Sequence, residues 1–151
     1  MKYQKVKVPA KHMIGIECRA SNANPLVIAQ HWERFYKEGV LSRIPDRLSE
    51  DVMALYCDYE SDHTKPYSLV IGCEVSSLEK IPQGMVGKTV PASTYAVFTA
   101  KGAFPKAIIE TWKTIWQTAL KRTYTGDFEI YGSKYNSMVD PEMNISIAIR
   151  D

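Results

Sequence analysis

The sequence has few cysteines, and the pattern of those it has excludes two classes of protein. Cys18, Cys57 and Cys73 form no C-x-x-C pair and no metal-ligand spacing with a histidine, so we expect neither a zinc site nor a disulfide framework. Each lies in an apolar, strand-like run, where a reduced thiol acts as a small hydrophobic side chain. We therefore expect a reduced protein with no metal and no cofactor.

Charge of one sign is also scarce. Lys and Arg number 19 and Asp and Glu 17, which leaves a formal net charge of +2. Proteins that bind nucleic acid through its phosphates carry a basic patch or stripe, and the longest cationic cluster here is Lys121-Arg122. We expect that pair to lie in the last turn of a helix, where positive charge complements the helix dipole. No direct DNA binding is expected.

Long apolar runs are missing as well. None approaches the roughly 20 residues of a membrane span, and the first five residues lack the apolar core of a signal peptide. We therefore expect a cytoplasmic protein that makes no membrane contact. What is present is ordinary for a globular protein, 151 residues of which 45% are hydrophobic and 24% charged. That length fits one domain, residues 1–151.

The first half of the chain, about residues 1–80, has the pattern strand, helix, strand, strand. An extended segment over 6–20 precedes a helix that Asn24-Pro25 should start and Gly39 should end. Two strand-like runs follow, 52–59 and 67–75, and the polar residues between them predict a hairpin.

The second half, about residues 81–151, repeats this order. A strand over 93–99 precedes a helix whose apolar residues recur at three- and four-residue spacing as far as Leu120. Strands over 128–134 and 143–149 follow, with a turn at 139–142. In this duplication Trp32 matches Trp112, Tyr56 matches Tyr131, and Ala54 falls opposite Glu129. Only one of the two lobes therefore carries an acid at this position.

Glu129 is the most informative residue. Side chains alternate along a strand, so Phe128 and Ile130 point one way and Glu129 and Tyr131 the other, and both faces look covered. A buried carboxylate loses several kcal/mol, roughly, of hydration unless it gains a cation, a hydrogen-bond partner or a proton. Glu129 is thus a candidate receptor for a positively charged ligand. Alternatively, it lies at a surface edge or pairs with a nearby Lys or Tyr hydroxyl.

Three motifs together carry a family resemblance over nearly the whole chain. They are YAVF at 95–98, ETWK at 110–113 and DFEIY at 127–131. The set resembles the GyrI-like small-molecule-binding domain, which is also the effector-binding module of AraC-type and MerR-type regulators and occurs as a stand-alone and integron-cassette protein. The resemblance implies an α+β fold in which duplicated strand-helix-strand-strand lobes form one curved antiparallel sheet. Two helices would lie on one face, with a central cleft between them.

The resemblance also implies a binding site. The acidic pocket residue of the family is matched by Glu129 and its helix tryptophan by Trp112. Further aromatic walls would come from the duplicated positions, Tyr131, Tyr56, Trp32 and Phe35. Such a cleft suits lipophilic cations, since aromatic faces attract a desolvated cation. We expect a stand-alone module that binds cationic aromatic small molecules and serves transcription regulation or toxin resistance. Trp116 and Tyr36 are expected to be packing or surface aromatics.

Two other functions stay open. Some members of the family are implicated as hydrolases of cyclopropane-containing alkylating toxins, and here Glu129 would activate water while Tyr131 or Tyr56 donated a proton. No Ser/His/Asp or Cys/His constellation supports another enzyme. The third function is a gyrase-inhibitor-like protein-binding module, to which the near-neutral charge gives little support. A homodimer or a complex with a regulator is compatible with all three.

Overall fold

The computed structural model describes residues 2–133, 135 and 141–151, and in this part of the chain one antiparallel sheet of eight strands carries three helices. The first lobe consists of β2 (Lys11–Ala20), α1 (Pro25–Lys37), the short α2 (Val40–Arg43), β3 (Val52–Cys57) and β4 (Tyr67–Val75). The second lobe consists of β6 (Ser93–Lys101), α3 (Lys106–Gln117), β7 (Asp127–Tyr131) and β8 (Glu142–Ile149). One further strand precedes each lobe, β1 (Gln4–Val8) and β5 (Val86–Val90).

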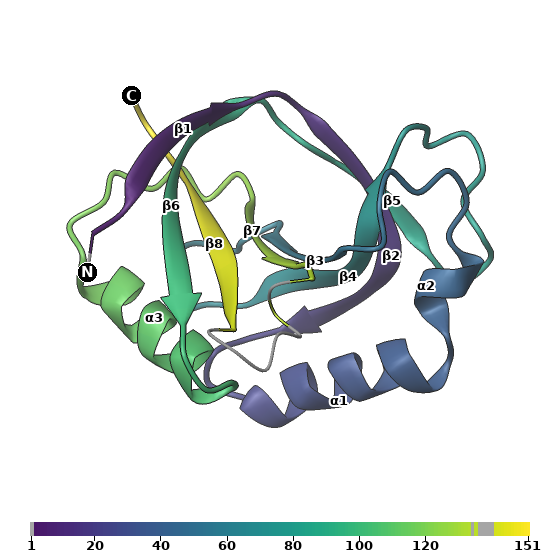
Figure 1. Cartoon of the computed structure of the whole chain (residues 1–151), viewed down its shortest axis with the longest axis horizontal. Coiled ribbons are helices and arrows are strands. Elements are labelled where there is room, and N and C mark those ends of the chain that lie inside the picture. Colours follow the sequence, from purple (N-terminus) through teal and green to yellow (C-terminus); the bar gives the residue numbers. More distant parts are fainter. Residues whose placement is uncertain (1, 134, 136–140) are drawn as a thin grey trace.

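The strand order is symmetric about the middle of the sheet. The order β1-β6-β8-β7-β3-β4-β2-β5 puts β7 and β3 at the centre, where Glu129 pairs with Ala54. Each edge strand pairs with the first strand of the other lobe, β1 with β6 and β5 with β2. The sheet is strongly curved, and α1 and α3 lie on one of its faces (Figure 1). This arrangement confirms the expected α+β fold of two duplicated lobes in one curved antiparallel sheet.

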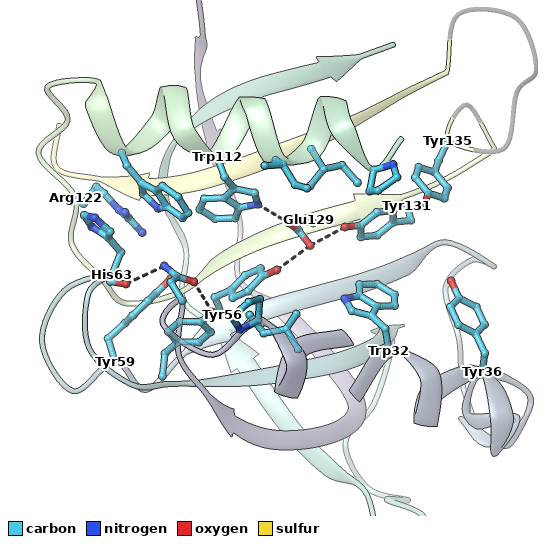
Figure 2. A pocket seen from close by; sticks show the side chains of 18 residues that line it. Trp32, Tyr36, Tyr56, Tyr59, His63, Trp112, Arg122, Glu129, Tyr131 and Tyr135 are labelled. Atoms are coloured by element: carbon cyan, nitrogen blue, oxygen red, sulfur yellow. Dashed lines mark hydrogen bonds between the residues drawn. The ribbon is translucent and has the colours of Figure 1, made fainter. Parts of the chain in front are cut away.

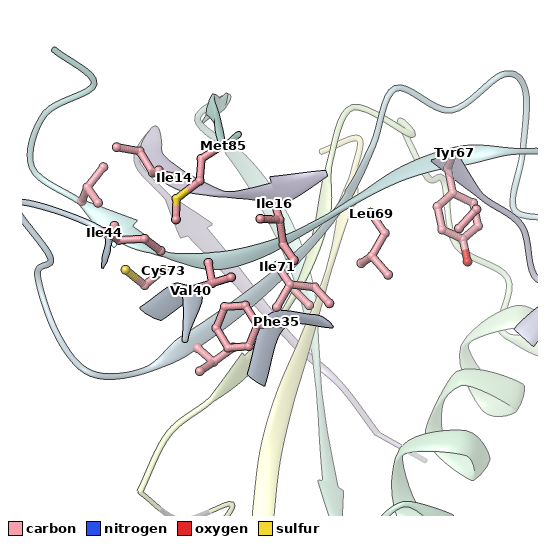
Figure 3. Packing of buried hydrophobic residues seen from close by; sticks show 14 residues of the cluster. Ile14, Ile16, Phe35, Val40, Ile44, Tyr67, Leu69, Ile71, Cys73 and Met85 are labelled. Atoms are coloured by element: carbon pink, nitrogen blue, oxygen red, sulfur yellow. The ribbon is translucent and has the colours of Figure 1, made fainter. Parts of the chain in front are cut away.

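Each long helix packs on its own half of that face. Pro25 suits the first turn of α1 because its φ is already helical, and Gly39 follows the end of the helix with a left-handed φ of 59°. Phe35 of α1 packs with Ile71 and other buried residues of the first lobe (Figure 3). Ile115 of α3 packs on the second lobe in the same way. The central strands β3 and β7 are left between the two helices as a floor.

The opposite face of the sheet has a core of its own, built from both lobes. Met13, Leu55, Tyr95 and Phe128 are buried there, and the rings of Tyr95 and Phe128 lie 5.1 Å apart. Because side chains alternate along β7, Phe128 enters this core while its neighbour Glu129 points to the helix face. Both faces of β7 are therefore covered, as the alternation predicts.

The edges of the sheet differ from the expectation. The single extended segment expected over 6–20 is two strands, separated at Pro9-Ala10. Proline has no N–H with which to continue a ladder of hydrogen bonds. The residues before Pro9 form β1, which pairs with β6 and does not extend β2. The strand β5 and the short helix α2 were not expected at all.

The second helix is shorter than the periodicity suggests. It ends at Gln117, and Thr118 already has an extended backbone with φ −84° and ψ 135°. The placement of Lys121-Arg122 in its last turn is therefore wrong. The carbonyl of Lys121 instead accepts a hydrogen bond from the N–H of Arg150 at 2.9 Å, and Arg122 is partly buried.

Two expectations fall at the end of the second lobe. Residues 139 and 140 of the turn expected over 139–142 lie outside the described residues, as does Lys134 of the strand expected over 128–134. The described part of that strand, β7, ends at Tyr131. Among the described residues no helix has both the length and the apolar character needed to cross a membrane.

Candidate functional site

A cleft with a volume of about 480 Å³ lies between α1 and α3 and has β3 and β7 as its floor (Figure 2). Its lining is dominated by rings that both lobes supply: Trp32, Tyr36, Tyr56, Tyr59, Tyr67, Trp112, Trp116, Tyr131 and Tyr135. Two charged side chains, Glu129 and Arg122, also reach it. The site is therefore mostly apolar, with charge at two defined places.

Glu129 lies at the centre of the floor and is only 1% exposed. Its Oε1 accepts hydrogen bonds from the hydroxyls of Tyr56 at 3.1 Å and Tyr131 at 2.8 Å, and its Oε2 accepts one from Nε1 of Trp112 at 2.7 Å. Within the described part of the chain, no lysine, arginine or histidine forms an ion pair with this carboxylate. Burial raises the pKa of Glu129, while the three hydrogen bonds act in the opposite direction and offset part of that rise.

The tyrosine donors are fixed by tryptophans of the opposite lobe. Trp32 on α1 meets Tyr131 of β7 edge to face, with ring centroids 5.1 Å apart and planes at 78°. Trp112 on α3 meets Tyr56 of β3 in the same way, at 5.4 Å and 70°. Burial and the neighbouring Glu129 raise the pKa of both tyrosines well above the ordinary value, so both hydroxyls keep their protons and donate. The pairing repeats across the pseudosymmetric lobes and holds the donors on Glu129.

A second buried carboxylate, Asp127, lies on the same face of β7. Its Oδ2 accepts a hydrogen bond from Nη2 of Arg122 at 2.8 Å and one from the hydroxyl of Tyr59 at 2.5 Å. Its Oδ1 accepts the N–H of Ala148 at 2.8 Å. The guanidinium of Arg122 thus gives Asp127 a cationic partner from the same chain.

An aromatic pair flanks the end of the cleft beside Arg122. His63, from the loop between β3 and β4, stacks on Trp116 of α3 with centroids 5.6 Å apart and planes at 8°. The side-chain amide of Asn22 donates to the carbonyl of His63 at 2.8 Å. Burial and the nearby Arg122 guanidinium lower the pKa of His63, so this imidazole is neutral around pH 7.

Five of the six ring and acid residues expected at the site line the cleft: Glu129, Tyr131, Trp112, Tyr56 and Trp32. Phe35 is not brought to the cleft surface. It is 2% exposed and packs in the core of the first lobe behind Trp32, with ring centroids 6.2 Å apart. Position 35 lies one helical turn after position 32, and its side chain points toward the sheet and not into the cleft. The duplication alone does not distinguish these two directions.

Sequence reasoning missed several residues of the cleft. Tyr36 and Trp116, expected to be packing or surface aromatics, both line it. Arg122 and Tyr59 were missed because the sequence analysis assigned a role to Glu129 but none to their partner Asp127. The available signal was the alternation in β7, which puts positions 127 and 129 on one face.

Comparison with known proteins identifies the class to which this chain belongs, the effector-binding proteins. The chain is a member of the Cass2 family, described as integron-associated effector binding protein, whose model matches residues 6–149. YobU of Bacillus subtilis (strain 168), which is named as a transcriptional regulator, is 31% identical over 149 residues, covering 93% of this chain and 92% of YobU.

Two solved structures are similar over almost their whole length. The integron cassette protein VCH_CASS2, from the mobile metagenome of Vibrio cholerae, has a TM-score of 0.77 and 28% identity over 99% of this chain and 96% of its own. SAV2435 bound to tetraphenylphosphonium has a TM-score of 0.82 and 23% identity over 99% and 94%. At that identity the likeness to SAV2435 establishes the fold alone.

Proposed function

We propose that residues 1–151 form one effector-binding domain that takes lipophilic, cationic aromatic small molecules into the cleft. Glu129 is the anionic centre, and Tyr131, Trp112, Tyr56 and Trp32 form the aromatic walls. The observation that carries this proposal is a fully buried carboxylate with three neutral donors and no cationic partner in the described chain.

The physical argument rests on the cost of burying Glu129. Removing a carboxylate from water costs several kcal/mol, roughly, and hydrogen bonds from neutral groups offset only part of that cost. A cation in the cleft would supply the missing charge. Desolvated aromatic walls add roughly 2 kcal/mol of cation–π attraction in favourable geometry. The tetraphenylphosphonium held by SAV2435, a protein of the same fold, is a ligand of this chemistry.

The module serves transcription regulation or toxin resistance in the cytoplasm, alone, as a homodimer or with a regulator. Family membership and the name of YobU support this role. Binding is favoured over hydrolysis of a strained ring because three donors already occupy the oxygens of Glu129. These bonds use three of the roughly four lone-pair sites of the carboxylate, which leaves little capacity to accept a proton from a water molecule.

A matched pair of flat ligands tests the proposal. N-methylacridinium carries a permanent charge, whereas acridine has nearly the same shape and is neutral at mildly alkaline pH. We expect the cation to quench the fluorescence of the cleft tryptophans at a concentration at least about 10-fold lower than acridine does. Equal or tighter binding of acridine would overturn the proposal.

A further inference from the structure

The end of the cleft beside Arg122 presents polar nitrogens that no described residue uses for a hydrogen bond. Arg122 gives one nitrogen, Nη2, to Asp127, but its Nε and Nη1 are buried and have no hydrogen-bond partner among the residues the structure describes. Nδ1 of His63, which donates in one of the two neutral tautomers of the ring, is likewise buried without a partner among those residues. The side chain of Arg122 is only 6% exposed, and both residues line the cleft (Figure 2).

This corner is rigidly built. The ring of Tyr124 covers one face of the Arg122 guanidinium, 4.4 Å from its Cζ. Asp127 is itself fixed by the N–H of Ala148 and the hydroxyl of Tyr59. The stack of His63 on Trp116 forms the wall next to Arg122. Donors that are held in place and shielded from water gain most from a ligand that accepts their hydrogen bonds.

The charges in the cleft decide which kind of acceptor fits. Arg122 and Asp127 cancel each other, so the carboxylate of Glu129 leaves the site with one negative charge. A monocation at Glu129 brings that sum to zero, and a ligand carboxylate would make it negative again in a poorly hydrated space. An uncharged acceptor oxygen is therefore preferred over an anionic one.

The spacing of the two poles follows from β7. Asp127, which holds Arg122, and Glu129 are two residues apart on one face of the strand. At a rise of about 3.3 Å per residue, Asp127 and Glu129 are about 7 Å apart along the strand, and the guanidinium of Arg122 lies beside Asp127 at 2.8 Å.

We propose that this corner is an acceptor subsite, and that the cleft selects cations carrying an uncharged acceptor oxygen at the end of the molecule that faces Arg122. The inference rests on the proposed function, since it assumes a cation at Glu129. It adds a second recognition element at the other end of the same ligand, formed by Arg122 and His63.

Three phosphonium ions of matched shape test the subsite in the intact protein. They are triphenylphosphonium ions whose fourth ring carries a para-isopropyl, para-acetyl or para-carboxyl group. The acetyl oxygen lies at the end of the ring opposite to phosphorus, and isopropyl has nearly the same shape without an acceptor. We expect the wild-type protein to bind the acetyl ion about 10-fold more tightly than the isopropyl ion. The carboxyl ion should bind no more tightly than the acetyl ion.

Two variants locate the effect. Arg122→Lys keeps a positive charge for Asp127 but removes the guanidinium donors, so the ratio of acetyl to isopropyl affinity should shrink to within about twofold. His63→Phe keeps a ring on Trp116 and removes Nδ1, so the preference should fall in part. If Arg122→Lys does not fold, the ligand series on wild type and His63→Phe still decides.

The failures are distinguishable. Equal affinity of wild type for the acetyl and isopropyl ions, with both bound, would overturn the acceptor subsite and leave the cation site standing. Tighter binding of the carboxyl ion would overturn the choice of an uncharged acceptor. If none of the three ions bound, both the proposed function and this inference would be overturned.

Discussion

Asp127 and Glu129 are two carboxylates on one face of one strand and are equally buried, yet they have different kinds of hydrogen-bond partner. Asp127 is 0% exposed and is paired with the guanidinium of Arg122, with further bonds from Tyr59 and a backbone N–H. Glu129 is 1% exposed and receives three bonds, all from neutral groups. Among the residues that the structure describes, the charge of Asp127 is balanced by a cation and that of Glu129 is not.

We propose that the difference separates a structural acid, Asp127, from a receptor acid, Glu129. Asp127 ties the segment after α3 to β7 through Arg122, and its partners also fix one end of the cleft. Glu129 faces the middle of the cleft, where the pseudosymmetric position in the first lobe is Ala54. An unpaired buried charge is costly in the free protein, and that cost is what a bound cation would relieve.

The largest expected effect is a loss of stability, and it should follow from removing the partner of Asp127 but not from removing the charge of Glu129. Arg122→Met leaves Asp127 buried without its cation, so we expect the free energy of unfolding to fall by about 3–5 kcal/mol. Glu129→Gln keeps the shape of the site and removes an unpaired charge, so stability should be unchanged or higher. Urea denaturation followed by circular dichroism measures both.

A matched control sharpens this comparison. The double variant Arg122→Met/Asp127→Asn leaves no unpaired charge at position 127 and should regain part of the lost stability. If Arg122→Met and Glu129→Gln changed the free energy of unfolding equally, the distinction between the two acids would not stand.

A smaller effect is expected in the pH dependence of stability. Because the pKa of Glu129 is raised above its ordinary 4.5 in the folded protein, the native state binds this proton more tightly than the unfolded chain does. Wild type should therefore lose stability relative to Glu129→Gln as pH rises from below 4.5 through the raised pKa. The change is about 1.4 kcal/mol for each pH unit by which folding raises the pKa.

Urea titrations of both proteins at a series of acidic pH values measure this difference, and all other titratable groups cancel. Above the raised pKa the two stability curves should run parallel, with Glu129→Gln the higher. Curves that stayed parallel across the whole acidic range would show that folding does not shift the pKa of Glu129.

Most of the fold followed from local patterns. Helix α1, strand β4 and the hairpin between β3 and β4 depend on neighbouring residues, so Pro25, Gly39 and the alternation of side chains were sufficient to predict them. The exchange of β1 and β5 between lobes depends on pairing between distant segments, which no local pattern records. The early end of α3 was missed because Leu120 continues the apolar period although the chain has already left the helix.

The candidate site was predictable where the duplication matched residue with residue. Trp32 with Trp112, and Tyr56 with Tyr131, are found around Glu129 at matching positions. Phe35 was misplaced because the duplication predicts which turn of the helix lies near the cleft but not the direction in which one side chain of that turn points. The pairing of Arg122 with Asp127 was missed because a surface role satisfied the sequence pattern equally well.

The charge of Glu129 can be tested directly by titrating wild type and Glu129→Gln with N-methylacridinium and with neutral acridine. Removing the charge while keeping the shape should weaken binding of the cation by about 1–3 kcal/mol, the scale of a charge-assisted contact. The affinity for acridine should be nearly unchanged. Equal affinity of the two proteins for N-methylacridinium would show that Glu129 is a structural acid like Asp127 and not the receptor for a cation.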